Sequence, residues 1–169
     1  MAAGTPRPRR ASRSPSVRYT IDASVFVNAF NPHEDGHAAS LQLLAAVQER
    51  GDPVMVPTLV IPEITAAVAR ASDDRVGALE YADATAALPH VTLVTLTTAM
   101  ARQAAELAAT YRLRGADAVY LAVAHRYGTT LVSRDGEQRT RGSAVVPCRS
   151  PEEALRDAGF LRGGRGSRA

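Results

Sequence analysis

The sequence predicts an α/β fold with a central, mainly parallel sheet. Short apolar segments alternate along the chain with longer segments whose apolar residues recur at a spacing of three to four. The short segments are near-continuous apolar runs, which is typical of strands that are buried on both faces of a sheet. The chain of 169 residues is the length of one ordinary domain.

The expected strands and helices follow one another in regular alternation. We expect strands at about residues 18–21, 53–56, 91–96, 130–133 and 144–147. We expect helices at about 24–30, 37–50, 62–70, 74–87, 97–111, 115–127 and 151–158, and a helical turn within 134–142. Ser24 is placed to cap the first helix, Pro62 fits a first helical turn, and Gly128 fits the position just after a helix.

The charge is distributed unevenly and suggests three regions. We expect a disordered basic tail over 1–17, one folded domain over 18–159, and a flexible basic tail over 160–169. All 20 basic residues are arginines, and eight of them lie in residues 1–18 and 162–169, which hold no acid. The segment between therefore has 12 arginines against 17 acids. Basic tails of this kind either contact nucleic acid or remain solvated, and the sequence leaves both open.

Composition excludes several classes of protein. A P-loop, a receiver domain and a haloacid-type phosphatase each use a lysine, and the chain has none. A single cysteine, Cys148, allows neither a disulfide within one chain nor a cysteine metal site, which fits a cytoplasmic setting. No apolar run approaches the roughly 18 residues that a membrane span needs, so we expect no membrane partner.

Four acids lie next to apolar segments. Asp22 follows the first expected strand, Asp135 lies two residues past the fourth, and Glu63 and Asp117 lie near the starts of apolar helices. Each has a purely structural explanation, because an acid in a first helical turn gains about 0.3–1 kcal/mol from the helix dipole and an aspartate can start a turn. We expect most of the other acids to lie on solvated faces: Glu49, Asp52, Asp73, Asp74, Glu80, Asp83, Glu152, Glu153 and Asp157.

Taken together, the four acids predict a metal site. Strand ends and helix starts of this kind meet along one edge of a parallel sheet. Carboxylates gathered there repel one another and call for a compensating cation. Oxygen ligands with open water positions suit Mg²⁺ or Mn²⁺.

Four segments carry a resemblance to a known family. They are Ile21-Asp22-Ala23-Ser24, Val60-Ile61-Pro62-Glu63-Ile64, Leu113-Arg114-Gly115-Ala116-Asp117-Ala118 and Leu131-Val132-Ser133-Arg134-Asp135. In this order and at these intervals the chain resembles a PIN domain. Within that group it is similar to the small VapC-like ribonuclease toxins of type II toxin–antitoxin systems, from about Tyr19 to Ala158.

The resemblance implies a three-layer α/β/α sandwich and a metal-dependent endoribonuclease, usually a homodimer, that a cognate antitoxin inhibits in a hetero-oligomer. It implies that Mg²⁺ or Mn²⁺ is bound by Asp22, Glu63, Asp117 and Asp135, with Ser24 and Ser133 as polar supports. RNA cleavage would leave 5′-phosphate and 3′-hydroxyl ends. The arginines nearest the acidic segments are candidate RNA contacts, namely Arg114, Arg134, Arg139 and Arg141.

Other functions remain open at this point. One is a housekeeping PIN nuclease for RNA processing that has no antitoxin. Another is a catalytically idle RNA-binding PIN domain, which four intact acids argue against. A nucleotide-binding α/β protein is disfavoured because no glycine-rich loop follows the first strand.

Overall fold

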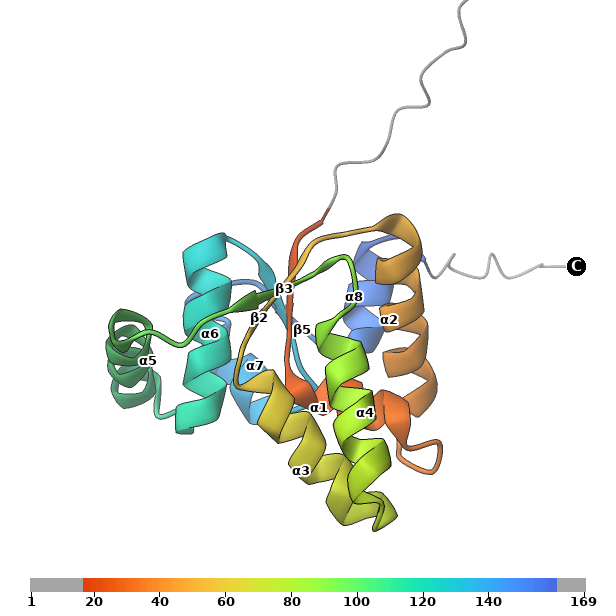
Figure 1. Ribbon diagram of the computed structural model, residues 1–169. Coiled ribbons are helices and arrows are strands. Elements are labelled where there is room, and N and C mark those ends of the chain that lie inside the picture. The colour runs from red at the N-terminus through yellow and green to blue at the C-terminus, as the bar shows by residue number, and fades with distance from the viewer. Residues whose placement is uncertain (1–16, 161–169) are drawn as a thin grey trace, which may run out of the picture.

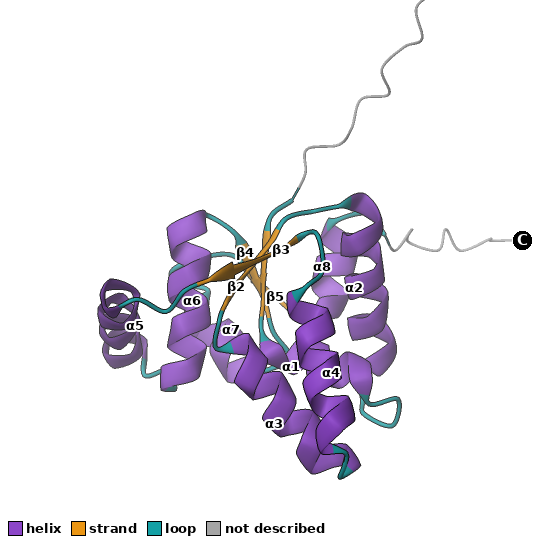
Figure 2. Ribbon diagram, viewed as in Figure 1, coloured by secondary structure: helices purple, strands orange, loops and turns teal. Residues whose placement is uncertain are grey.

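A computed structural model describes residues 17–160 as a three-layer α/β/α domain with the sheet in the middle (Figures 1 and 2). The expected tails over 1–17 and 160–169 lie outside the described residues, apart from Val17 and Phe160. Both of these pack partly buried against the hydrophobic core. Within 17–160, no helix is long and apolar enough to cross a membrane.

The sheet has five strands in the order β3-β2-β1-β4-β5, and every neighbouring pair is parallel. The strands are β1 (Tyr19–Ile21), β2 (Val54–Pro57), β3 (Val91–Val94), β4 (Thr130–Val132) and β5 (Cys148–Arg149). The predicted parallel sheet is thereby confirmed. β1 is central and fully buried, as its apolar sequence requires.

The helices cover both faces of the sheet. They are α1 (Ala23–Phe30), α2 (His37–Arg50), α3 (Val60–Ser72), α4 (Arg75–Ala86), α5 (Thr98–Tyr111), α6 (Gly115–Tyr127), α7 (Gly136–Gly142) and α8 (Pro151–Asp157). In Figure 1, α5 and α6 lie on one side of the strands, and α2, α4 and α8 lie on the other. The α6 helix packs directly on β1, β2 and β4, which explains why its residues 118–124 are all buried.

The predicted position of the fifth strand was wrong. The strand is at Cys148–Arg149, not at 144–147. Residues 144 to 146 form a turn after α7, in which the N–H groups of Val145 and Val146 both donate to the carbonyl of Gly142. The apolar run at 144–147 reflects the burial of Val146 in this turn and not a strand.

Asp52 does not lie on a solvated face as expected. Its side chain is only 2% exposed and pairs with Arg50 Nε at 3.1 Å. Its backbone N–H donates to the carbonyl of Val47, just after the left-handed Gly51 that ends α2. The turn therefore folds Asp52 back against the helix end, which local polarity does not reveal.

The strand order places several helix starts at one edge of the sheet. All strands are parallel, so their carboxyl ends share that edge. The α1, α3 and α7 helices begin there, each shortly after β1, β2 or β4, and Figure 1 shows them together at the lower end of the molecule. The four acids that the sequence analysis singled out lie at this edge.

Candidate active site

A pocket of about 610 Å³ opens at the carboxyl edge of the sheet, and all four predicted acids line it. The other lining residues are Ala23, Ser24, Val27, Leu59, Pro62, Ala66, Ala67, Arg70 and Arg114. Segments that are far apart in the sequence therefore contribute their carboxyl groups to one hollow.

Asp22 is the N-cap of α1. Its Oδ2 accepts a 2.8 Å hydrogen bond from the backbone N–H of Ser24, and its Oδ1 accepts one of 3.3 Å from Gln138 Nε2. Burial raises the pKa of Asp22, the hydrogen bonds from Ser24 and Gln138 oppose that rise, and the charge of Asp135 adds to it. Asp22 is thus a fixed carboxylate with only 7% of its surface exposed.

Ser24 does not cap α1, which corrects the sequence prediction. The helix begins one residue earlier than expected because Asp22 has the extended backbone and the side-chain bond of an N-cap. The Ser24 hydroxyl instead accepts a 3.1 Å hydrogen bond from the backbone N–H of Arg134. Ser24 therefore joins the segment after β1 to the segment after β4.

Asp135 caps α7 in the same way that Asp22 caps α1. Its Oδ1 accepts hydrogen bonds from the N–H groups of Glu137 at 2.7 Å and Gln138 at 3.0 Å. Its own N–H donates to the hydroxyl of the buried Ser133 at 3.0 Å. Ser133 thus holds the backbone from which Asp135 enters the pocket.

Glu63 lies in the first turn of α3 and is half-buried. The Tyr120 hydroxyl donates a 2.7 Å hydrogen bond to Glu63 Oε2. Burial raises the pKa of Glu63, the Tyr120 hydrogen bond lowers it, and the charges of Asp22 and Asp117 raise it further. Tyr120 was not among the residues predicted from the sequence, although its place one helical turn after Asp117 is a usable signal.

Asp117 lies in the first turn of α6. Burial raises its pKa from the ordinary 3.8 to about 6, the charges of Asp22 and Asp135 act in the same direction, and Arg114 acts against them. Three of the four acids therefore have raised pKa values, and each of them is influenced by at least one of the others.

The raised pKa values and mutual repulsion of these carboxylates favour the binding of a divalent cation. Neighbouring carboxylates disfavour one another's charged forms, and a cation reverses that effect. Oxygen donors in an open pocket suit Mg²⁺ or Mn²⁺. Within residues 17–160, however, no three His, Cys, Asp or Glu side chains are close enough to form the ligand set of one ion. The support for a metal is therefore the chemistry of the donors and their mutual repulsion.

The four predicted arginines occupy different surroundings. Arg114 lines the pocket, has a side chain that is 76% exposed, and lies 3.7 Å from Asp135 Oδ2. The other three contact the domain itself: Arg134 binds Glu152 and the carbonyl of Asp35, Arg139 binds the carbonyl of Ser133, and Arg141 pairs with Glu137.

Arg70 also lines the pocket, and it was not among the predicted contacts. It lies on α3 seven residues after Glu63, and Ala66 and Ala67 lie between them on the same lining surface. This is the spacing of one helical face. The small alanines leave the pocket open between the acid and the arginine.

Fold and pocket together define a class, namely α/β proteins with a carboxylate-lined pocket at the carboxyl edge of a parallel sheet. The family pattern of the PIN domain matches residues 19–142, which include all four acids. The chain belongs to the PIN domain family. This membership confirms the resemblance that the four sequence segments indicated, and it supports a nuclease.

Solved structures of the same fold come from several bacteria. VapC20 of Mycobacterium tuberculosis, described as a sarcin–ricin loop cleaving toxin, is 22% identical with a TM-score of 0.64, over 74% of this chain and 95% of that chain. VapBC2 of Rickettsia felis, bound to a promoter DNA fragment, is 13% identical with a TM-score of 0.59, over 79% and 98%.

A toxin–antitoxin complex from Klebsiella pneumoniae is 17% identical with a TM-score of 0.56, over 80% of this chain and 98% of that chain. At these identities the likeness is one of fold. No curated protein matches the chain by sequence.

Proposed function

We propose that this protein is a Mg²⁺- or Mn²⁺-dependent endoribonuclease, the toxin of a type II toxin–antitoxin module. The observation that carries the proposal is that Asp22, Glu63, Asp117 and Asp135 line one pocket. Membership of the PIN domain family supports the nuclease class. The description of VapC20 as a toxin that cleaves the sarcin–ricin loop supports RNA as the substrate.

Three of the four acids contribute a carboxylate that hydrogen bonds hold in place. Asp22 and Asp135 are held by the helix starts that they cap, and Glu63 is held by Tyr120. Divalent cations held among these four residues, each by one or two carboxylates and by water, would offset the repulsion of an RNA phosphate and would lower the pKa of a bound water for in-line attack. Ser24 and Ser133 keep the two capping aspartates in register through backbone contacts.

The arginines of the pocket bind the substrate backbone in this proposal. Arg70 and Arg114 both line the pocket, and guanidinium groups bind phosphate through paired hydrogen bonds. Contacts of this kind position the RNA without reading its bases.

The toxin role and the antitoxin partner are supported by similar folds in known assemblies, not by the pocket. VapBC2 and the Klebsiella complex are toxin–antitoxin assemblies of this fold, and we extend that role, together with homodimer formation, to this chain as part of the proposal.

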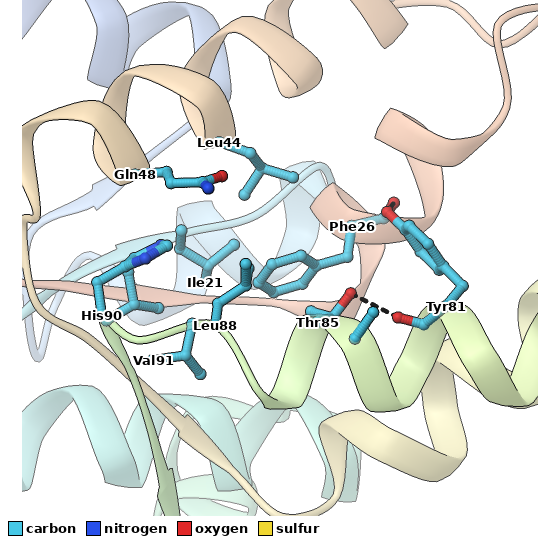
Figure 3. A pocket seen from close by; sticks show the side chains of 11 residues that line it. Ile21, Phe26, Leu44, Gln48, Tyr81, Thr85, Leu88, His90 and Val91 are labelled. Atoms are coloured by element: carbon cyan, nitrogen blue, oxygen red, sulfur yellow. Dashed lines mark hydrogen bonds between the residues drawn. The ribbon is translucent and has the colours of Figure 1, made fainter.

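A second, apolar pocket of about 220 Å³ lies away from the acids, between α1, α2, α4 and the sheet, lined by Phe26, Leu44, Tyr81, Leu88 and His90 among others (Figure 3). Leu41 on α2 and Leu79 on α4 are exposed, and we include these two helices in the proposal as candidate contacts of a protein partner.

RNA cleavage tests the nuclease proposal. Purified protein is expected to cut RNA with Mg²⁺ or Mn²⁺ and to stop in EDTA. Asp22→Asn should lose at least about 100-fold in rate while remaining folded, because asparagine also caps helices. The matched control is Asp83→Asn, an exposed acid on α4 that does not line the pocket. Absence of cleavage in both metals, or equal cleavage by Asp22→Asn, overturns the proposal.

Expression in a bacterial host separates a toxin from a housekeeping nuclease. A toxin should arrest growth on induction, and Asp22→Asn should abolish the arrest. Normal growth of cells that make an active wild-type nuclease counts against the toxin role and leaves the nuclease assignment intact.

A further inference from the structure

Gln138 contacts three of the four acidic residues. It lies on α7 with only 1% of its surface exposed. Its backbone N–H donates to Asp135 Oδ1 at 3.0 Å, and its side-chain Nε2 donates to Asp22 Oδ1 and to the carbonyl oxygen of Asp117, both at 3.3 Å. The buried side-chain amide therefore connects the end of β1 with the first turn of α6, and the backbone N–H of the same residue contacts Asp135 after β4.

The orientation of this amide is determined by its surroundings. Both groups within reach of Nε2 are oxygen acceptors, so the nitrogen must face them. The amide oxygen, Oε1, is buried and has no hydrogen-bond partner among the described residues. A buried acceptor without a partner lowers the stability of the folded state.

This combination links the buried amide to the acidic site. Leucine or methionine would fill a similar volume without an unpaired acceptor of its own, but the Asp22 carboxylate and the Asp117 carbonyl would each lose a donor. Glutamine at this site instead aims two hydrogen bonds at acidic residues that line the pocket. Polar side chains that hold metal-ligating residues in place typically contribute about 10–100-fold to metal affinity.

We propose that Gln138 is a positioning residue of the acidic site, which fixes the Asp22 carboxylate relative to the start of α6 so that Asp22 can take part in binding a divalent cation. The inference rests on the proposed metal-dependent function. Gln138 itself need not touch the cation or the RNA, since its two side-chain donors are both directed at protein oxygens.

The test compares Gln138→Met and Gln138→Leu with the wild type in the full-length protein. Three quantities are measured: Mn²⁺ affinity by calorimetry, melting temperature in EDTA, and RNA cleavage. We expect Mn²⁺ affinity and cleavage to fall at least about 10-fold, while both variants remain folded in EDTA at the assay temperature. Gln103→Met is the matched control, because Gln103 lies on α5 and does not line the pocket.

Two results overturn the inference while the wild type still binds Mn²⁺ and cuts RNA. One is Mn²⁺ affinity within about two-fold of wild type in either folded variant. The other is failure of both variants to fold, which would make Gln138 a structural residue. A wild type that neither binds Mn²⁺ nor cuts RNA instead overturns the proposed function, and the inference with it.

Discussion

The Tyr120 hydroxyl donates a 2.7 Å hydrogen bond to Glu63 Oε2, joining two residues that are 57 positions apart. Tyr120 is fully buried on α6, and Glu63 lies in the first turn of α3. The bond gives the carboxylate a fixed orientation at the pocket wall. It also favours the charged form of Glu63, against the burial that raises its pKa.

Tyr120→Phe removes this donor and leaves the ring in the core. We expect RNA cleavage to fall about 10-fold at neutral pH, because a carboxylate without its partner is less well oriented. Loss of the hydrogen bond also raises the pKa of Glu63 further, so the rise of cleavage with pH should move to higher pH. The measurement is a pH–rate profile for each protein.

Tyr127→Phe is the control for this substitution, since Tyr127 ends the same helix and is 37% exposed. Identical profiles for Tyr120→Phe and wild type would show that the hydrogen bond does not position Glu63.

The raised pKa of Asp117 predicts a pH dependence of stability. Its folded value is about 6 against an ordinary value of 3.8, so the folded state binds its proton more tightly. The resulting stabilisation is complete below about pH 4 and is lost as the pH rises through about 6. In EDTA, the melting temperature of Asp117→Asn should therefore rise relative to that of wild type as the pH increases from about 4 to about 7.

Thermal melts at closely spaced pH values check this relation. Added Mn²⁺ should raise the melting temperature of wild type at about pH 7 much more than that of Asp117→Asn. A difference between the two proteins that stays constant with pH would contradict the raised pKa.

Arg70 is predicted to bind RNA phosphate. On the inactive Asp22→Asn background, Arg70→Gln should weaken binding of a short single-stranded RNA about 10-fold at low salt. One phosphate contact fewer should reduce the slope of log affinity against log salt by about 0.7. Fluorescence anisotropy at several salt concentrations measures both quantities.

Arg102→Gln provides the comparison for Arg70, because it is exposed on α5 and does not line the pocket. If both substitutions have the same small effect, Arg70 does not contact the RNA.

Substitution of Gly36 is predicted to lower the stability of the fold because of the Arg134 side chain. It has a φ of +80°, and a Cβ at this position would collide with the Arg134 guanidinium, which binds Glu152 and the carbonyl of Asp35. Gly36→Ala should therefore lose more stability than the roughly 1–2 kcal/mol that a left-handed alanine costs. Urea denaturation measures the loss.

Gly51→Ala gives the reference value, since Gly51 has a φ of +64° and a methyl group there would have no atom within 4 Å to collide with. On an Arg134→Ala background, the excess cost of Gly36→Ala should disappear. Equal losses of stability for the two alanine substitutions would show that the Arg134 side chain moves aside without a measurable cost.

The order of strands and helices and the identity of the four acids could be predicted from the sequence alone. Apolar pairs such as Leu131 and Val132 identify buried strands without any tertiary information. Asp22 and Asp135 could be found because each follows such a strand closely in the sequence. The fifth strand was misplaced because burial of Val146 in a turn produces the same apolar pattern as a strand.

The side chains that surround those acids could be found only in the folded domain. The contact between Gln138 and Asp22 spans 116 positions and depends on how α7 packs against the end of β1. Arg70 enters the pocket through the direction of α3, and Arg134 contacts Glu152 and the Asp35 carbonyl instead. Local sequence indicates roughly where a helix begins, because the hydrogen bonds of a helix cap join neighbouring residues. The orientation of a carboxylate depends on partners that packing alone brings within hydrogen-bond distance.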